Sequence, residues 1–168
     1  MEELPAWLRD STLLLDSNFF IDAFRDKNGY GKFVRDLKDI GVAFVSPNFV
    51  KYEFIRSKTI DVVREKEKYF HQIIDTVLPY DQKIDDLAIS TIEEYKQYME
   101  GLPLTDLVLA IYLKRYKGLR LLTRDHGDFP TTVFTREYIF NIESFRDRIY
   151  AIYSYKPKTS TLEEEIPF

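Results

Sequence analysis

The chain has 168 residues, of which 45% are hydrophobic and 15% aromatic, and this composition predicts one globular domain and excludes a disordered chain. It contains no cysteine, which excludes disulfides, zinc–thiolate sites and a cysteine nucleophile and favours the reducing cytoplasm. The formal net charge of -4 argues against nucleic-acid capture by a broadly basic surface, but not against a nuclease that gathers carboxylates around divalent cations.

Short apolar runs alternate with amphipathic stretches along the chain, after a first segment that has no signal-peptide or membrane-span pattern. We expect strands over residues 12–16, 42–46, 76–80 and 119–123, and one or two more over residues 131–135 and 138–142. We expect helices over residues 19–27, 32–40, 48–58, 59–76, 84–99 and 104–118, and another near residues 144–153. This alternation predicts an α/β fold over residues 1–153, with a mainly parallel sheet and helices on both faces.

The segment over residues 154–168 differs from the rest of the chain. It has two prolines, a run of acidic residues and no hydrophobic periodicity. We therefore expect a flexible C-terminal tail or a docking arm there.

Two aspartates stand at the carboxyl ends of expected strands. Asp16 comes after "LLL" and Asp125 comes one residue after "LLT", with Asp128 in the same loop. Parallel sheets bind ligands beyond the carboxyl ends of their strands, where the strand order reverses, so both carboxylates should project from one edge. Taken singly, each aspartate is more simply explained as a helix cap or a turn former.

Two further carboxylates occupy unusual helical positions. Glu53 falls between Phe49 and Val50 on the apolar face of its expected helix, where an unpaired charge costs several kcal/mol. An internal salt bridge or a solvent-exposed helix end would also explain it. Asp106 opens a strongly apolar helix, where the helix dipole alone would favour it. Together the carboxylates can converge only around positive charge, and hard oxygen ligands favour Mg²⁺ or Mn²⁺.

The segments "LLLDSNFFIDAF", "SPNFVKYEF", "LPLTDLVLAIYL" and "LLTRDHGDF" resemble, in order and spacing, the acidic motifs of PIN-domain nucleases. The resemblance runs from Leu13 to Phe129, and the chain is longer than a minimal toxin of that family. It implies a three-layer α/β/α sandwich and metal-dependent cleavage of single-stranded RNA, often by the toxin of a toxin–antitoxin pair. The catalytic positions it implies are Asp16, Glu53, Asp106, Asp125 and Asp128, with Ser17, Asn18 and Thr123 in supporting positions.

These residues suggest a hypothesis for the mechanism. Asp16, Asp106 and Asp125 would hold one or two Mg²⁺ or Mn²⁺ ions, and the other two acidic residues would complete the site or orient water. The basic residues beside the motifs could position the RNA backbone, although a solvated surface explains each of them as well. They are Lys51, Arg56 and Arg124.

Other functions are less well supported by the sequence. A haloacid-dehalogenase-type phosphohydrolase needs a second aspartate where Asn18 stands, and a nucleotide binder needs glycine-rich phosphate loops that are missing. A catalytically weak PIN-like module for RNA binding or assembly remains the alternative to the nuclease. The apolar stripe of residues 59–76, together with the resemblance, suggests a homodimer, and the resemblance also suggests an antitoxin partner.

Overall fold

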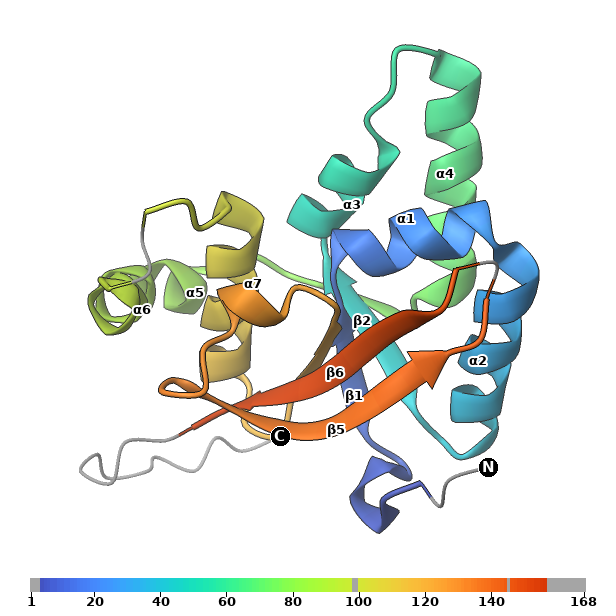
Figure 1. Cartoon of the computed structure of the whole chain (residues 1–168). Coiled ribbons are helices and arrows are strands. Elements are labelled where there is room, and N and C mark those ends of the chain that lie inside the picture. Colours follow the sequence, from blue (N-terminus) through green and yellow to red (C-terminus); the bar gives the residue numbers. More distant parts are fainter. Residues whose placement is uncertain (1–3, 98–99, 145, 157–168) are drawn as a thin grey trace.

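A computed structural model describes residues 4–97, 100–144 and 146–156 of the chain (Figure 1). Its strands are β1 (Thr12–Leu15), β2 (Ala43–Pro47), β3 (Thr76–Leu78), β4 (Arg120–Thr123), β5 (Phe134–Ile142) and β6 (Arg148–Tyr155). Its α-helices are α1 (Ser17–Arg25), α2 (Lys27–Asp39), α3 (Asn48–Ile55), α4 (Ile60–Ile73), α5 (Gln82–Asp86), α6 (Ala88–Tyr95) and α7 (Leu104–Arg115). Short 3-10 helices cover Ala6–Leu8 (η1) and His126–Asp128 (η2).

The strands form one six-stranded sheet in the order β3-β2-β1-β4-β6-β5. Strand β1 pairs in parallel with β2 and β4, and β2 pairs in parallel with β3. Strand β6 runs antiparallel to both β4 and β5. The predicted mainly parallel sheet is therefore confirmed. The strand order reverses at β1, because the chain passes to β2 and β3 on one side and returns to β4 on the other.

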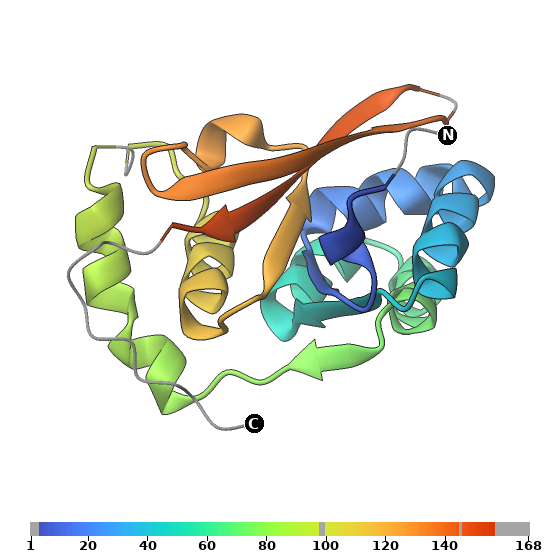
Figure 2. The ribbon, with the colours of Figure 1, turned by 90° about the horizontal axis from the view of Figure 1, so that it is seen from below.

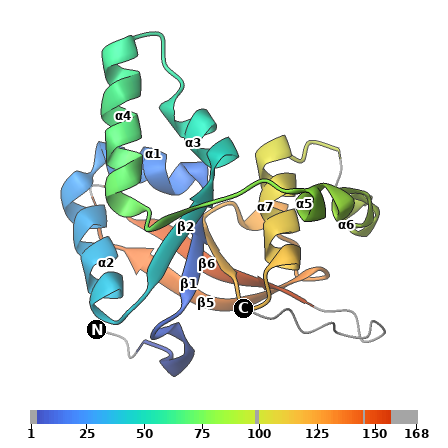
Figure 3. The ribbon, with the colours of Figure 1, turned by 180° about the vertical axis from the view of Figure 1, so that it is seen from behind.

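Helices cover both faces of this sheet, as expected for a three-layer α/β/α sandwich. Helices α1, α2 and α4 lie on one side, and α5, α6 and α7 lie on the other (Figures 2 and 3). Helix α7 is apolar on nearly every side, and all residues from Val108 to Leu113 are buried. Among the described residues, none of the helices combines the length and apolar character of a membrane span.

The C-terminal part of the sheet differs from the sequence-based expectation. The predicted helix near residues 144–153 is wrong, because this segment contributes most of strand β6. Its sequence is rich in Ile and Tyr, which favour strands, and it lies between β4 and β5. Strand β6 extends to Tyr155, two residues into the predicted tail, and residues 157–168 of that tail lie outside the described residues.

Candidate metal centre

The candidate site is a cleft of about 480 Å³ at the carboxyl edge of the parallel strands. Helix α1 begins directly after β1, α3 begins directly after β2, and the loop after β4 leads into η2. The cleft thus lies where the strand order reverses, which is the usual ligand position in such sheets. Its carboxylates are Glu53, Asp106, Asp125 and Asp128, its basic residues are Arg25, Arg56 and Lys66, and Ser17 and Asn18 also line it.

Three of the carboxylates form a compact cluster. One carboxylate oxygen each from Asp106, Asp125 and Asp128 lies within 4.8 Å of the other two. Asp106 comes from the first turn of α7, and the other two come from the loop after β4 and from η2. Asp106 is buried and its two neighbours are half-buried. Oxygen atoms at this spacing, from two separate elements, could hold one hard divalent cation.

Burial and neighbouring negative charges raise pKa values in this cluster. Burial raises the pKa of Asp106 to about 8, and the negative charges of Asp128, Asp16 and Asp125 add to this increase. Burial also raises the pKa of Asp125, where Asp128 adds to the effect and Arg124 opposes it. Burial and mutual repulsion therefore disfavour the ionised forms of Asp106 and Asp125, and a divalent cation would offset both effects.

Asp16 lies next to this cluster but has a structural role as well. One carboxylate oxygen caps α1 by accepting the Phe19 N–H at 2.9 Å, and the other accepts the Thr123 hydroxyl. Asp16 is 1% exposed. Burial raises its pKa to about 7, although these two hydrogen bonds act to lower it. The prediction that Asp16 holds a metal ion directly or through water stays a prediction. The carboxylate oxygens that cluster in the structure are those of Asp106, Asp125 and Asp128.

The predicted supporting residues connect β1, α1 and the loop after β4. The Thr123 hydroxyl donates to Asp16 and accepts the Asp125 N–H at 3.0 Å. Asn18 donates from its amide nitrogen to the Asp125 carboxylate, and its oxygen accepts from Arg124 at 3.4 Å. Ser17 is buried and lines the cleft. These contacts set the orientation of the Asp125 carboxylate.

Glu53 contributes an acceptor from a third element. Its Oε2 atom is buried and has no hydrogen-bond partner among the described residues. Nor does any described basic residue form a salt bridge with it, so the alternative of an internal ion pair has no support. A desolvated carboxylate oxygen without a donor is costly unless a ligand satisfies it. Because Glu53 lines the same cleft, a cation or its bound water could do so.

The three basic residues expected to bind RNA have different surroundings. Arg56 is exposed and lines the cleft. Lys51 lies outside the cleft lining, and its Nζ is 3.8 Å from a carboxylate oxygen of Glu67. Arg124 forms an ion pair with Asp22 at 2.8 Å, so its positive charge is balanced within the protein.

Sequence reasoning missed the part played by Asp22. Its side chain is 5% exposed, accepts the Tyr150 hydroxyl at 2.8 Å and pairs with Arg124. It thereby ties α1 to β6 and to the loop after β4. The available signal was a lone aspartate inside the apolar stretch "FFIDAF", which resembles the signal used for Glu53. The cleft residues Arg25 and Lys66 were missed too, because nothing near them in sequence marks a site.

Comparison with known proteins adds no family assignment, since no family model, curated protein or solved structure matches the chain. The fold and the cleft therefore define its class. It is an α/β/α sandwich with a carboxylate cluster at the switch point of a mainly parallel sheet.

Proposed function

We propose that this protein is a Mg²⁺- or Mn²⁺-dependent endoribonuclease of the PIN-like type that cleaves single-stranded RNA. The observation that carries the proposal is the cluster of Asp106, Asp125 and Asp128, whose oxygens lie within 4.8 Å of one another beside Glu53. Such a cluster needs positive charge to be stable in its ionised form. Basic residues at the rim of the same cleft fit a substrate with a phosphate backbone.

The residues present fit a hard cation better than any other ligand. The clustered ligand atoms are carboxylate oxygens, the chain has no cysteine, and an unpartnered Glu53 oxygen is buried in the cleft lining. The three clustered aspartates would hold the ion directly. A divalent cation in such a site supplies a more acidic water and neutralises negative charge on a phosphate.

The remaining side chains have roles that follow from their positions. The unpartnered Oε2 of Glu53 is an acceptor that can orient a water molecule and take its proton. Asn18 holds the Asp125 carboxylate in place. Arg56 and Lys66 line the cleft, where they can bind the strand on either side of the scissile phosphate.

The test is cleavage of an unstructured, end-labelled RNA oligonucleotide with Mg²⁺, with Mn²⁺ or with chelator. The parent should cleave when Mg²⁺ or Mn²⁺ is present and should not cleave in chelator. Asp125→Asn should lose at least about 100-fold in cleavage rate because it removes a metal ligand. Asp39→Asn is the matched control, since Asp39 is exposed at the end of α2 and outside the cleft lining. Asp16→Asn is less informative, because it also removes the cap of α1.

Cleavage that persists in chelator, or an Asp125→Asn variant as active as the parent, would contradict the proposal. RNA binding without cleavage under any metal condition would replace it with the PIN-like binding module.

We further propose that the protein acts in the cytoplasm as a homodimer and as the toxin of a toxin–antitoxin pair. Its resemblance to PIN-domain toxins supports the toxin role. Large exposed apolar side chains support self-association, since Ile89 is 73% exposed and Leu104 is 69% exposed. Light scattering should show a dimer mass that Ile89→Asp lowers to a monomer. Expression of the parent, but not of Asp125→Asn, should arrest growth; equal growth would contradict the toxin role.

A further inference from the structure

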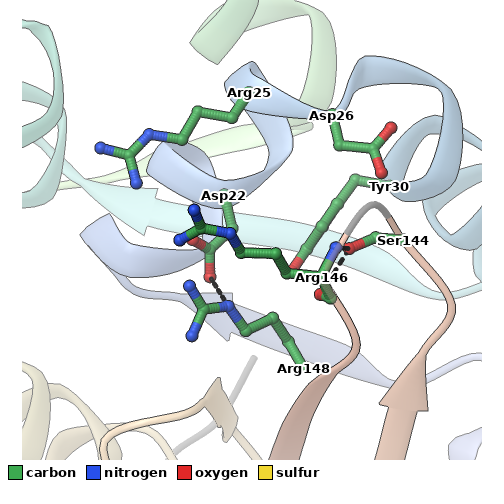
Figure 4. Close-up of a pocket in the computed structure, with 7 residues that line it drawn as sticks. All are labelled: Asp22, Arg25, Asp26, Tyr30, Ser144, Arg146 and Arg148. Atoms are coloured by element: carbon green, nitrogen blue, oxygen red, sulfur yellow. Dashed lines mark hydrogen bonds and ion pairs between the residues drawn. The ribbon is translucent and has the colours of Figure 1, made fainter.

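A second pocket, of about 440 Å³, lies beside the candidate metal centre. One wall is the α1–α2 junction with Asp22, Arg25, Asp26 and Tyr30, and the other is Arg146 in the β5–β6 connection with Arg148 at the start of β6 (Figure 4). Arg25 lines both this pocket and the carboxylate cleft, so the two are neighbours along α1. We name this pocket the arginine pocket.

The arginine pocket has more positive charge than its own carboxylates neutralise. Three arginines and two carboxylates, Asp22 and Asp26, line it, and no described carboxylate forms an ion pair with Arg25 or Arg146. Asp22 is the nearest partner of Arg148, at 3.9 Å, but it already accepts from Tyr150 and pairs with Arg124 at 2.8 Å. Figure 4 shows the three guanidinium groups along one side of the pocket. The pocket therefore favours an anion with several acceptor oxygens.

A buried donor reinforces this preference. Arg148 Nε and the Tyr30 hydroxyl are buried; Arg148 Nε has only the Asp22 carboxylate at 3.9 Å, and the contact of Tyr30 is with the Tyr150 hydroxyl. Tyr30 is 1% exposed, and Figure 4 shows its side chain extending from α2 toward the arginines. Arg148 Nε lacks an acceptor at hydrogen-bond distance, which costs free energy in a buried site, and a bound anion would supply one.

The pocket is also held in shape by close backbone packing. A Cβ atom at Gly29 would lie 2.9 Å from the Glu143 carbonyl oxygen, so only glycine allows α2 to approach the β5–β6 connection this closely. The Ser144 hydroxyl donates to the Arg146 carbonyl at 2.7 Å and accepts the Arg146 N–H at 3.2 Å. These contacts fix the backbone that carries Arg146 before any ligand arrives, which lowers the cost of binding.

We propose that the arginine pocket binds a backbone phosphate of the RNA strand next to the scissile phosphodiester. Helix α1 carries Asn18 at the metal centre and Arg25 at the pocket, and the rise of an α-helix separates them by about 10 Å. That spacing suits a neighbouring phosphate of the strand that enters the cleft. Arginine is suited to this task because its planar fork binds phosphate oxygens in pairs. This inference rests on the proposed ribonuclease function.

The experiment measures binding of a labelled single-stranded RNA oligonucleotide by fluorescence anisotropy, in chelator so that no cleavage occurs. The test variant is Arg25→Gln/Arg146→Gln. The control, Arg9→Gln/Arg35→Gln, removes the same charge from two exposed arginines that line neither pocket. We expect the test variant to bind about tenfold more weakly and the control to bind like the parent. The slope of log K against log salt should fall by about 0.7 for each phosphate that the variant no longer neutralises.

Equal weakening in both variants, or no weakening in the test variant, would overturn the arginine pocket as a phosphate site. The result is independent of catalysis. If the test variant alone loses RNA binding while the parent never cleaves RNA, the pocket stands and the nuclease proposal falls. If the parent cleaves RNA and the test variant cleaves with unchanged KM, the nuclease stands and the pocket falls.

Discussion

Replacing Asp106 with asparagine should stabilise the metal-free protein at alkaline pH. The pKa of Asp106 is raised from 3.8 in an unfolded chain to about 8 in the fold. The folded protein thus retains a proton that the unfolded chain releases, so the free energy of unfolding falls as pH rises from about 4 to about 8. Asparagine has nearly the same shape and never ionises, so Asp106→Asn removes this contribution.

The magnitude follows from the same pKa. A rise from 3.8 to about 8 corresponds to an upper limit of ~6 kcal/mol at pH 8.5. Water entry and side-chain movement relieve part of the desolvation, so we expect ~2 kcal/mol, or about 4 to 8 °C in Tm.

Urea unfolding in chelator at pH 5.5 and pH 8.5 measures this effect. At pH 5.5 the folded parent keeps this proton while the unfolded chain has already released it, so the advantage of the variant should be present but less than half of that at pH 8.5. At pH 8.5 the variant should be the more stable of the two, while Asp39→Asn should match the parent at both values. If Asp106→Asn is less stable than the parent at pH 8.5, or if the parent gains stability over this range, the electrostatic reasoning is wrong.

Further predictions concern the surrounding residues. Mn²⁺ at about 100 times its Kd should stabilise the parent by ~2.7 kcal/mol. A given rise in Tm should need more Mn²⁺ at pH 6 than at pH 8, because protons compete for the aspartates. Thermal-shift curves that need the same Mn²⁺ concentration at both pH values would contradict this. Glu53→Gln should keep the Mn²⁺-induced shift in Tm but lose about 100-fold in cleavage rate, and loss of the shift would make Glu53 a ligand. Asp22→Asn should cost ~2 kcal/mol in urea unfolding, because it leaves Arg124 and Tyr150 without their carboxylate; no loss would show that solvent replaces it. Thr123→Val should lower the free energy of unfolding by about 1 to 2 kcal/mol, because it leaves the Asp125 N–H unpaired. Unchanged stability would show that the Thr123 hydroxyl does not stabilise this loop.

Local sequence patterns predicted the parallel half of the sheet well. The apolar runs before Asp16 and Asp125 are buried strands, and β1 and β4 pair with Leu15 opposite Leu122. The rule for parallel sheets then brings the two aspartates to one edge without any knowledge of side-chain positions. The tertiary contacts of β6 could not be read in this way. Whether "RIYAIYSY" forms a strand depends on β4 and β5, and these pairings are non-local.

Side-chain partners were the part of the site that sequence could not supply. Asp16 and Thr123 are 107 residues apart, and Asp22 and Tyr150 are 128 residues apart. No spacing rule reaches over such distances. The partners of Asp16 have the same origin, because its two oxygens accept from the Phe19 N–H and from the distant Thr123 hydroxyl, while Asp128 lies with Asp106 and Asp125.

The most direct test of the central claim is a titration of the protein with Mn²⁺ at pH 8, with free Mn²⁺ measured by electron paramagnetic resonance. The carboxylate cluster predicts saturable binding by the parent that weakens at least about tenfold in Asp106→Asn and in Asp125→Asn. Asp39→Asn should bind like the parent. Parent protein that leaves the Mn²⁺ signal unchanged, or cluster variants that bind as tightly as the parent, would contradict a metal centre at this site.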